Sequence, residues 1–104
     1  MKFVRFVMGG AAKAAEVGAV NDKVWASPPP GTKLLASYTC MGIAFPGALA
    51  PNTMVGISII EAESAEGMVA VAYPLMLAGV TVWFVPVMEM PVAGEAEVEK
   101  KYRG

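Results

Sequence analysis

The chain has 104 residues, a net charge of −1, no histidine and one cysteine. This length predicts a single domain with one core, and the near-neutral charge provides no basic field for nucleic acid. Without histidine the commonest general base and most zinc sites are excluded. A lone cysteine cannot form an internal disulfide, which fits a reducing compartment and predicts a cytoplasmic location.

The balance of apolar and charged residues is unusual, at 56% hydrophobic against 16% charged. Such excess apolar surface indicates an interface between copies, a ligand cavity or a membrane, and we expect the interface first. The uncharged runs 34–60 and 67–88 are each long enough to span a bilayer. Prolines and glycines interrupt both runs, so short elements are favoured over membrane helices.

The first half of the chain predicts a strand, a helix and a second strand. Residues 2–8 alternate as in a strand that the glycines at 9 and 10 would end, and residues 11–25 are alanine-rich and helical. Three prolines make 27–31 an extended connector before a strand over 33–43. The apolar side of the helix would consist of Ala14, Val17, Val20 or Asn21, and Val24.

The second half repeats this order more clearly. Residues 55–60 are β-branched and predict a strand, and Ser64 is a candidate N-cap for a helix over 65–73. We expect this helix to kink or restart at Pro74 and to stop at Gly79. Residues 80–87 predict a last strand, in which Pro86 indicates an edge or a bulge.

Two segments lie outside these elements. The loop at 45–53 carries Phe45 and Leu49 and is more apolar than a simple solvent-exposed turn, so we expect it to add contacts between copies. Residues 1–90 form the predicted domain, and 91–104 form a charged tail that is a short helix or frayed.

The predicted order is strand, helix, strand, strand, helix, strand. With right-handed crossovers, two such halves interlock into a four-stranded antiparallel sheet with both helices on one face. The predicted fold class is therefore α+β and ferredoxin-like, βαββαβ.

The pattern GISIIEAESAEGM…YPLMLAGVTVWFVPVMEM over 56–90 resembles the dimeric α/β-barrel superfamily, in particular an uncharacterised branch. The acidic turn Glu61-Ala62-Glu63-Ser64 is similar to its strand-to-helix junction, and Phe84–Val87 to the last strand of that branch. The superfamily includes muconolactone isomerases and small cofactor-independent monooxygenases. The resemblance covers residues 1–90 and implies a dimer formed through the sheet. The catalytic histidine of some members has no counterpart here.

The two sheet faces follow from strand alternation. We assign Val4, Phe6, Met8, Ile57, Ile59, Val80, Val82 and Phe84 to the helix side. The helix-free face would then carry Phe3, Arg5, Val7, Ser58, Ile60, Thr81, Trp83 and Val85. In the superfamily this second face meets its twin and lines a cavity, so the candidate ligand-binding residues are Phe3, Ser58, Thr81 and Trp83.

Arg5 is the sharpest candidate on that face. It could lie over Trp83 as a cation–π pair or hold an acidic ligand. Alternatively it is structural and pairs across the dimer with Glu61 or Glu89, which is the interpretation that we favour.

Other candidate groups have plainer interpretations. Cys40 has no nearby cation or base to activate it and fits a small buried hydrophobe. The glutamates at 61, 63 and 66 resemble a helix cap more than a metal site, so we expect neither a metal nor a cofactor.

Three functions remain open on the sequence. The leading hypothesis is an oligomeric binding or assembly module that encloses a small apolar or aromatic ligand. The second is a cofactor-independent isomerase or monooxygenase acting on an apolar substrate, in which Arg5, Tyr38 and Glu61 would be orienter, proton donor and base. The third is an accessory subunit of a larger complex, docked through its excess apolar surface.

Overall fold

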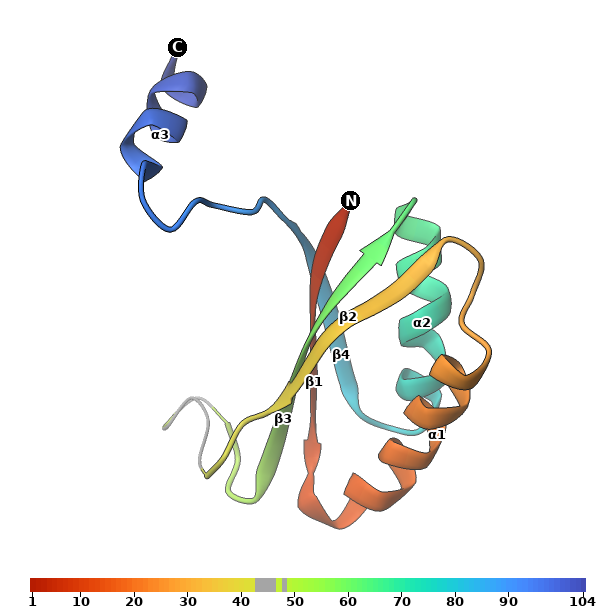
Figure 1. Ribbon diagram of the computed structural model, residues 1–104. Helices are drawn as coiled ribbons and strands as arrows, with labels where there is room; N and C mark the ends of the chain where they lie inside the picture. Colours follow the sequence, from red (N-terminus) through yellow and green to blue (C-terminus); the bar gives the residue numbers. More distant parts are fainter. Residues whose placement is uncertain (43–46, 48) are drawn as a thin grey trace.

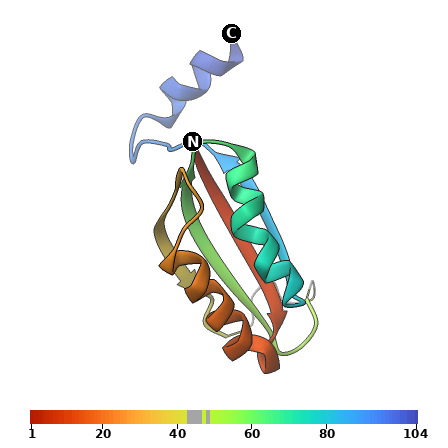
Figure 2. The same ribbon diagram turned by 90° about the vertical axis from the view of Figure 1, so that its right-hand side faces the viewer.

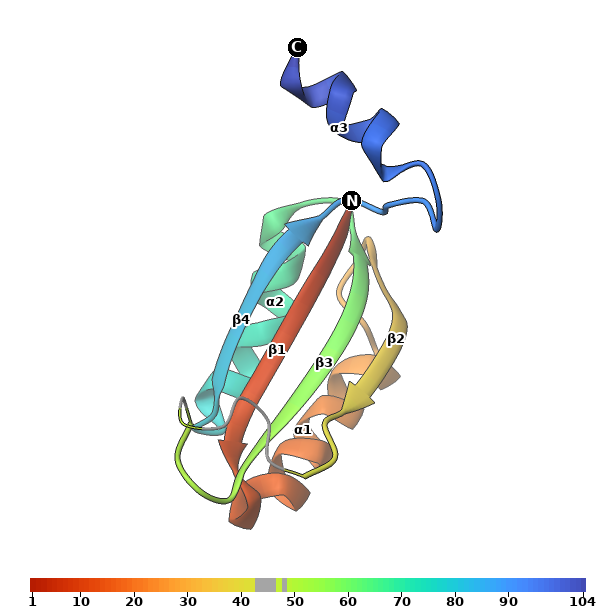
Figure 3. The same cartoon turned by 90° about the vertical axis from the view of Figure 1, so that its left-hand side faces the viewer.

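The computed structural model describes residues 1–42, 47 and 49–104. Four antiparallel strands form one sheet in the order β2-β3-β1-β4. Two helices cover one face of this sheet (Figures 1 and 2), and no described helix lies over the other face (Figure 3). This is the predicted ferredoxin-like α+β fold. The elements are β1 (Lys2–Gly10), a 3-10 turn (Ala11–Lys13), α1 (Ala14–Ala26), β2 (Thr32–Thr39), β3 (Thr53–Ala62), α2 (Ala65–Leu77), β4 (Thr81–Val87) and α3 (Glu95–Arg103).

Strand β1 continues through both glycines instead of ending before them. A Cβ added at Gly9 would lie 2.5 Å from Cγ1 of Val80, so the glycine here permits close packing of a neighbouring segment rather than a turn. Strand β2 ends at Thr39, earlier than predicted. The predicted contacts of Phe45 lie outside the described residues. Strand β4 is an edge strand, as Pro86 indicated.

Helix α2 is capped as predicted, because the N–H of Gly67 donates to Oγ of Ser64 at 3.3 Å. The helix does not restart at Pro74 but runs on to Leu77. Pro74 has no N–H to donate to the carbonyl of Ala70, and Ala70 is an exposed residue that water can reach. The helix stops at Gly79, whose φ of +93° suits glycine.

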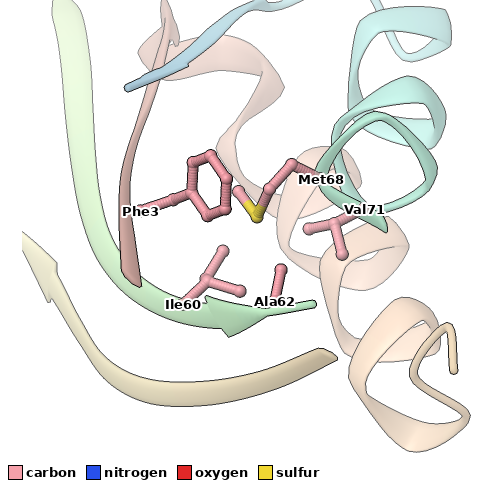
Figure 4. Packing of buried hydrophobic residues seen from close by; sticks show 5 residues of the cluster. All are labelled: Phe3, Ile60, Ala62, Met68 and Val71. Atoms are coloured by element: carbon pink, nitrogen blue, oxygen red, sulfur yellow. The ribbon is translucent and has the colours of Figure 1, made fainter. Parts of the chain in front are cut away.

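The core lies between the sheet and α2 (Figure 4). Met68 and Val71 of α2 pack against Phe3 of β1 and Ile60 of β3. The ring of Phe3 meets that of Phe84 edge to face, with centroids 5.9 Å apart. Helix α2 buries four residues at helical spacing, whereas α1 buries none. The two helices therefore cover the sheet unequally, and α1 leaves room beneath it.

The sequence assigned the faces of β1 and β3 the wrong way round. Phe3, Arg5, Ser58 and Ile60 are all buried, and Phe3 and Ile60 belong to the core beneath the helices. Val7 pairs with Gly56 and lies on the same side by alternation. The assignment of β4 was right: Val80 and Phe84 face the helices, and Trp83 faces away at 46% exposure.

The C-terminal segment leaves the sheet after β4, and α3 lies apart from the rest of the molecule (Figure 1). Its ion pairs join residues of α3 itself, Lys100 to Glu97 and Arg103 to Glu99. Over the described ranges, none of the helices has the length and apolar character needed to cross a bilayer.

Candidate functional site

A cleft of about 180 Å³ lies between α1 and the sheet. Small residues contribute to this space, since Ala14 and Gly18 of α1 and Gly56 of β3 are among its lining residues. A Cβ added at Gly18 would meet nothing within 4 Å, and one at Gly56 only the carbonyl oxygen of Tyr38, at 3.8 Å. The other lining residues are Arg5, Val7, Gly9, Gly10, Val17, Asn21, Ser37, Tyr38, Thr39, Met54, Val55, Ser58, Leu75 and Val80.

Arg5 is the one charged residue among those that line the cleft. It is 2% exposed, and its Nη2 donates to Oδ1 of Asn21 and to Oγ of Ser58, each at 3.2 Å. Within the described part of the chain, Nε and Nη1 of Arg5 are buried without a hydrogen-bond partner. Buried donors are rarely left in this state, so the guanidinium has unused capacity for an acceptor.

The orientation of the Asn21 amide follows from its two neighbours. Its Oδ1 accepts from Nη2 of Arg5 and from Nε1 of Trp25, both at 3.2 Å. Arginine and the indole N–H can only donate, so the oxygen must face them and the amide nitrogen must point elsewhere. Asn21 therefore adds further N–H donors to a wall of the cleft.

Ser58 and Ser37 form a second polar contact on the floor of the cleft, with their hydroxyl oxygens 3.2 Å apart. The chain from Ser37 through Ser58 and Arg5 to Asn21 and Trp25 crosses from β2 to α1. It holds the guanidinium in place without any carboxylate.

The electrostatics of the cleft are one-sided. Burial lowers the pKa of Arg5 to about 10, which still leaves it charged at neutral pH. The described residues of the lining include no aspartate or glutamate. Across the described ranges, no group of three or more cysteine, aspartate or glutamate side chains could hold a metal ion.

The structure separates the three residues proposed as catalytic. Tyr38 also lines the cleft, but it pairs with Ile57 and its side chain is 64% exposed, so alternation directs its ring to the opposite face. Glu61 is at the end of β3 and binds the N-terminal amine of Met1 at 3.1 Å. Arg5 and Glu61 are therefore not brought together.

Within one copy of the chain, the residues predicted to contact Arg5 have other partners. Glu61 is engaged with Met1, and Glu89 accepts from Nζ of Lys2 at 3.1 Å. Trp83 lies on the other face, where it stacks on Phe6 with centroids 4.2 Å apart. Arg5 therefore forms neither the predicted cation–π contact with Trp83 nor, within one copy, a pair with either glutamate.

The four predicted ligand-binding residues divide between three places. Ser58 lines the cleft, and Phe3 is in the core next to it. Thr81 and Trp83 are exposed on the helix-free face. Sequence reasoning missed Asn21, Trp25 and Ser37 as site residues. Asn21 did carry a signal, since it falls on the apolar stripe of α1, where a polar side chain needs a buried partner.

The helix-free face of the sheet is apolar except for one row of charged side chains at its end. Lys2, Glu61 and Lys33 pair across the end of the sheet. The following rows hold only uncharged side chains, among them the stacked rings of Phe6 and Trp83. The remaining members of these rows are Val4, Ala36, Tyr38, Ile57, Ile59 and Val85.

The chain is remotely similar in fold to several solved structures. No protein-family model matches the chain, and no curated protein matches it significantly. SnoaB, a cofactor-independent oxygenase from Streptomyces nogalater, is 13% identical with a TM-score of 0.49, over 89% of this chain and 100% of its own. A DUF3240 family protein from Shewanella baltica is 8% identical with a TM-score of 0.43, over 89% and 97%. Both scores are too low to carry an argument, and the fold rests on the strand order.

Proposed function

We propose that the protein is a dimeric binding module that takes a small, largely apolar ligand into the cleft beneath α1. The observation that supports this proposal is the cleft itself, whose volume is about 180 Å³. The buried polar side chains of Arg5 and Ser58 line it, at a position where a small domain would normally have an apolar core. Glycine inside a strand weakens it, so keeping Gly56 open has a cost that ligand entry would justify.

Binding is favoured over catalysis by the residues that the cleft contains. An isomerase or monooxygenase of the kind considered above would need a proton acceptor within hydrogen-bond reach of the substrate. Glu61, the candidate base, is outside the cleft, and the described residues that line the cleft include no carboxylate. Arg5 and Asn21 offer only donors for orienting a ligand.

The test is to fill the cleft from its floor. Gly56→Leu places a side chain where the glycine leaves space, and Gly56→Ala adds a single carbon as the matched control. Single-ring compounds at millimolar concentration should shift the amide resonances of Val17 and of residue 56 in the wild type and in the alanine variant. They should not shift Val17 in the leucine variant. Native mass spectrometry of freshly purified protein would also detect a retained ligand. The proposal fails if no compound perturbs the cleft and no ligand is retained.

The dimer is proposed from the helix-free face. Its uncharged rows leave Trp83 46%, Val85 41% and Tyr38 64% exposed, and a second copy would cover them. Light scattering should give twice the chain mass for the wild type and a single mass for Trp83→Glu. The control Tyr73→Glu changes an aromatic residue of similar exposure on α2 and should remain dimeric. A monomeric wild type would refute the dimer.

A further inference from the structure

We propose that the ligand of the cleft is a single-ring organic acid whose carboxylate is bound by Arg5. This inference rests on the proposed binding function and adds the chemical class of the ligand. It is carried by a buried guanidinium with unpartnered donors, in a cleft whose described residues provide no negative charge to balance it.

The first step concerns charge. Buried charges in folded proteins are normally paired or hydrogen-bonded on all sides. Arg5 uses Nη2 on two neutral oxygens and leaves Nε and Nη1 without a partner among the described residues. The two glutamates expected to pair with Arg5 are engaged elsewhere, Glu61 with Met1 and Glu89 with Lys2. The described residues therefore do not supply the acceptor that these donors lack.

The second step concerns geometry. The planar fork of arginine suits a carboxylate, which accepts on two oxygens. Asn21 turns its amide oxygen toward Arg5 and Trp25, so its amide nitrogen is available as another donor. A site rich in donors and poor in acceptors selects an anion over an alcohol or an amide, since these neutral groups satisfy fewer of its donors.

The third step concerns size. A dry cavity of about 150 Å³ in another protein holds one benzene ring. The cleft here is about 180 Å³, and the apolar members of its lining include Val7, Val17, Leu75 and Val80. One ring or a short branched chain fits this space beside the carboxylate, whereas a fused polycycle does not.

The experiment compares an acid with its neutral analogue by isothermal titration calorimetry and amide chemical shifts. Sodium benzoate and benzamide are titrated at matched ionic strength into the full chain and into two variants. Arg5→Met removes the guanidinium. Arg103→Met makes the same substitution at the chain's other arginine, an exposed residue of α3. A sodium chloride titration controls for simple screening of charge.

Three outcomes are distinguishable. The proposal expects benzoate to bind at least tenfold more tightly than benzamide, to lose at least tenfold in Arg5→Met and to be unchanged in Arg103→Met. Equal binding of both compounds, with shifts in the cleft that survive Arg5→Met, would overturn the anion inference and leave the binding function standing. Binding of neither compound, in a folded protein whose cleft resonances do not move, would overturn the inference. If larger or aliphatic compounds also fail, the binding function falls with it.

Discussion

Arg5→Met should leave the ligand-free protein about as stable as the wild type, although it removes two hydrogen bonds from the interior. Methionine keeps an unbranched stem of similar reach and adapts to irregular space. The groups that Arg5 contacts both keep a second partner, because Asn21 still accepts from Trp25 and Ser58 still meets Ser37. The substitution therefore leaves no new unsatisfied polar group at those two positions.

The magnitude follows from the cost of the buried charge. At about 1.4 kcal/mol for each pKa unit, the fall in the pKa of Arg5 to about 10 corresponds to about 3 kcal/mol of unfavourable burial. The two lost hydrogen bonds are donated by a charged group, so each contributes about 1.5 kcal/mol at the weak end expected for its length of 3.2 Å. The two terms nearly cancel, and the net expectation is a change in stability of no more than about 1 kcal/mol, or within about 4–8 °C in Tm for a domain of this length.

The sign of the pH dependence adds a second check. The pKa of Arg5 is lowered in the folded state, so the penalty is fully present below about pH 10 and is relieved only as the pH rises beyond it. The stability difference between variant and wild type should therefore be the same at neutral and at mildly acidic pH.

Urea unfolding followed by circular dichroism measures the difference in the free energy of unfolding between variant and wild type. Both proteins are measured at the same concentration and in a buffer without carboxylates, so that dimerisation and ligand binding do not alter the comparison. Arg103→Met is again the matched control and should change stability by less than about 0.5 kcal/mol. If Arg5 were instead a structural residue with all its partners in place, its removal would cost about 3–5 kcal/mol. A loss of that size in the Arg5→Met variant would show that the guanidinium is fully partnered in the ligand-free protein.

Three further predictions concern the scaffold around the cleft. Gly18→Ala should raise stability by about 0.5–1 kcal/mol in chemical unfolding, because a Cβ there meets nothing and glycine disfavours a helix interior; a loss would show that α1 sits closer to the sheet. Ser64→Ala should cost about 1 kcal/mol in the same assay, since it removes the cap bond to Gly67, and Ser64→Asp should restore it. A chain ending at Met90 should keep its thermal transition, because the ion pairs of α3 are internal to it; unfolding on truncation would contradict the proposed 1–90 domain.

The order of elements was readable from the sequence because each signal was local. Ser64 marked the start of α2, Gly79 marked its end, and the β-branched runs marked β3 and β4. These signals depend on backbone chemistry within a few residues, and neighbours elsewhere in the fold did not override them.

The side of β1 that faces the helices could not be predicted in the same way. Alternation identifies the buried face only when the other face is polar. Here Phe3 and Val7 alternate with Val4 and Phe6, so both faces are apolar and a charge was the only marker. Arg5 was predicted to lie on the helix-free face, but the fold buries it opposite Ser58. The informative pattern was one polar residue on the inward side of each of three elements: Arg5, Asn21 and Ser58. This pattern becomes visible only when the strands and the helix are placed together in the fold.

The same reversal connects the two proposals. With Arg5 turned toward the helices, the helix-free face loses the one charge that the sequence had assigned to its centre, and its middle rows become wholly uncharged. Desolvating those rows against a second copy then strands no ion, which removes the main electrostatic cost of a dimer. Conversely, the guanidinium is almost fully buried on the other side of the sheet, where its attraction for a carboxylate is screened less than at the protein surface. Placing one arginine on one side of the sheet thus favours association on the other side and anion binding beneath the helices.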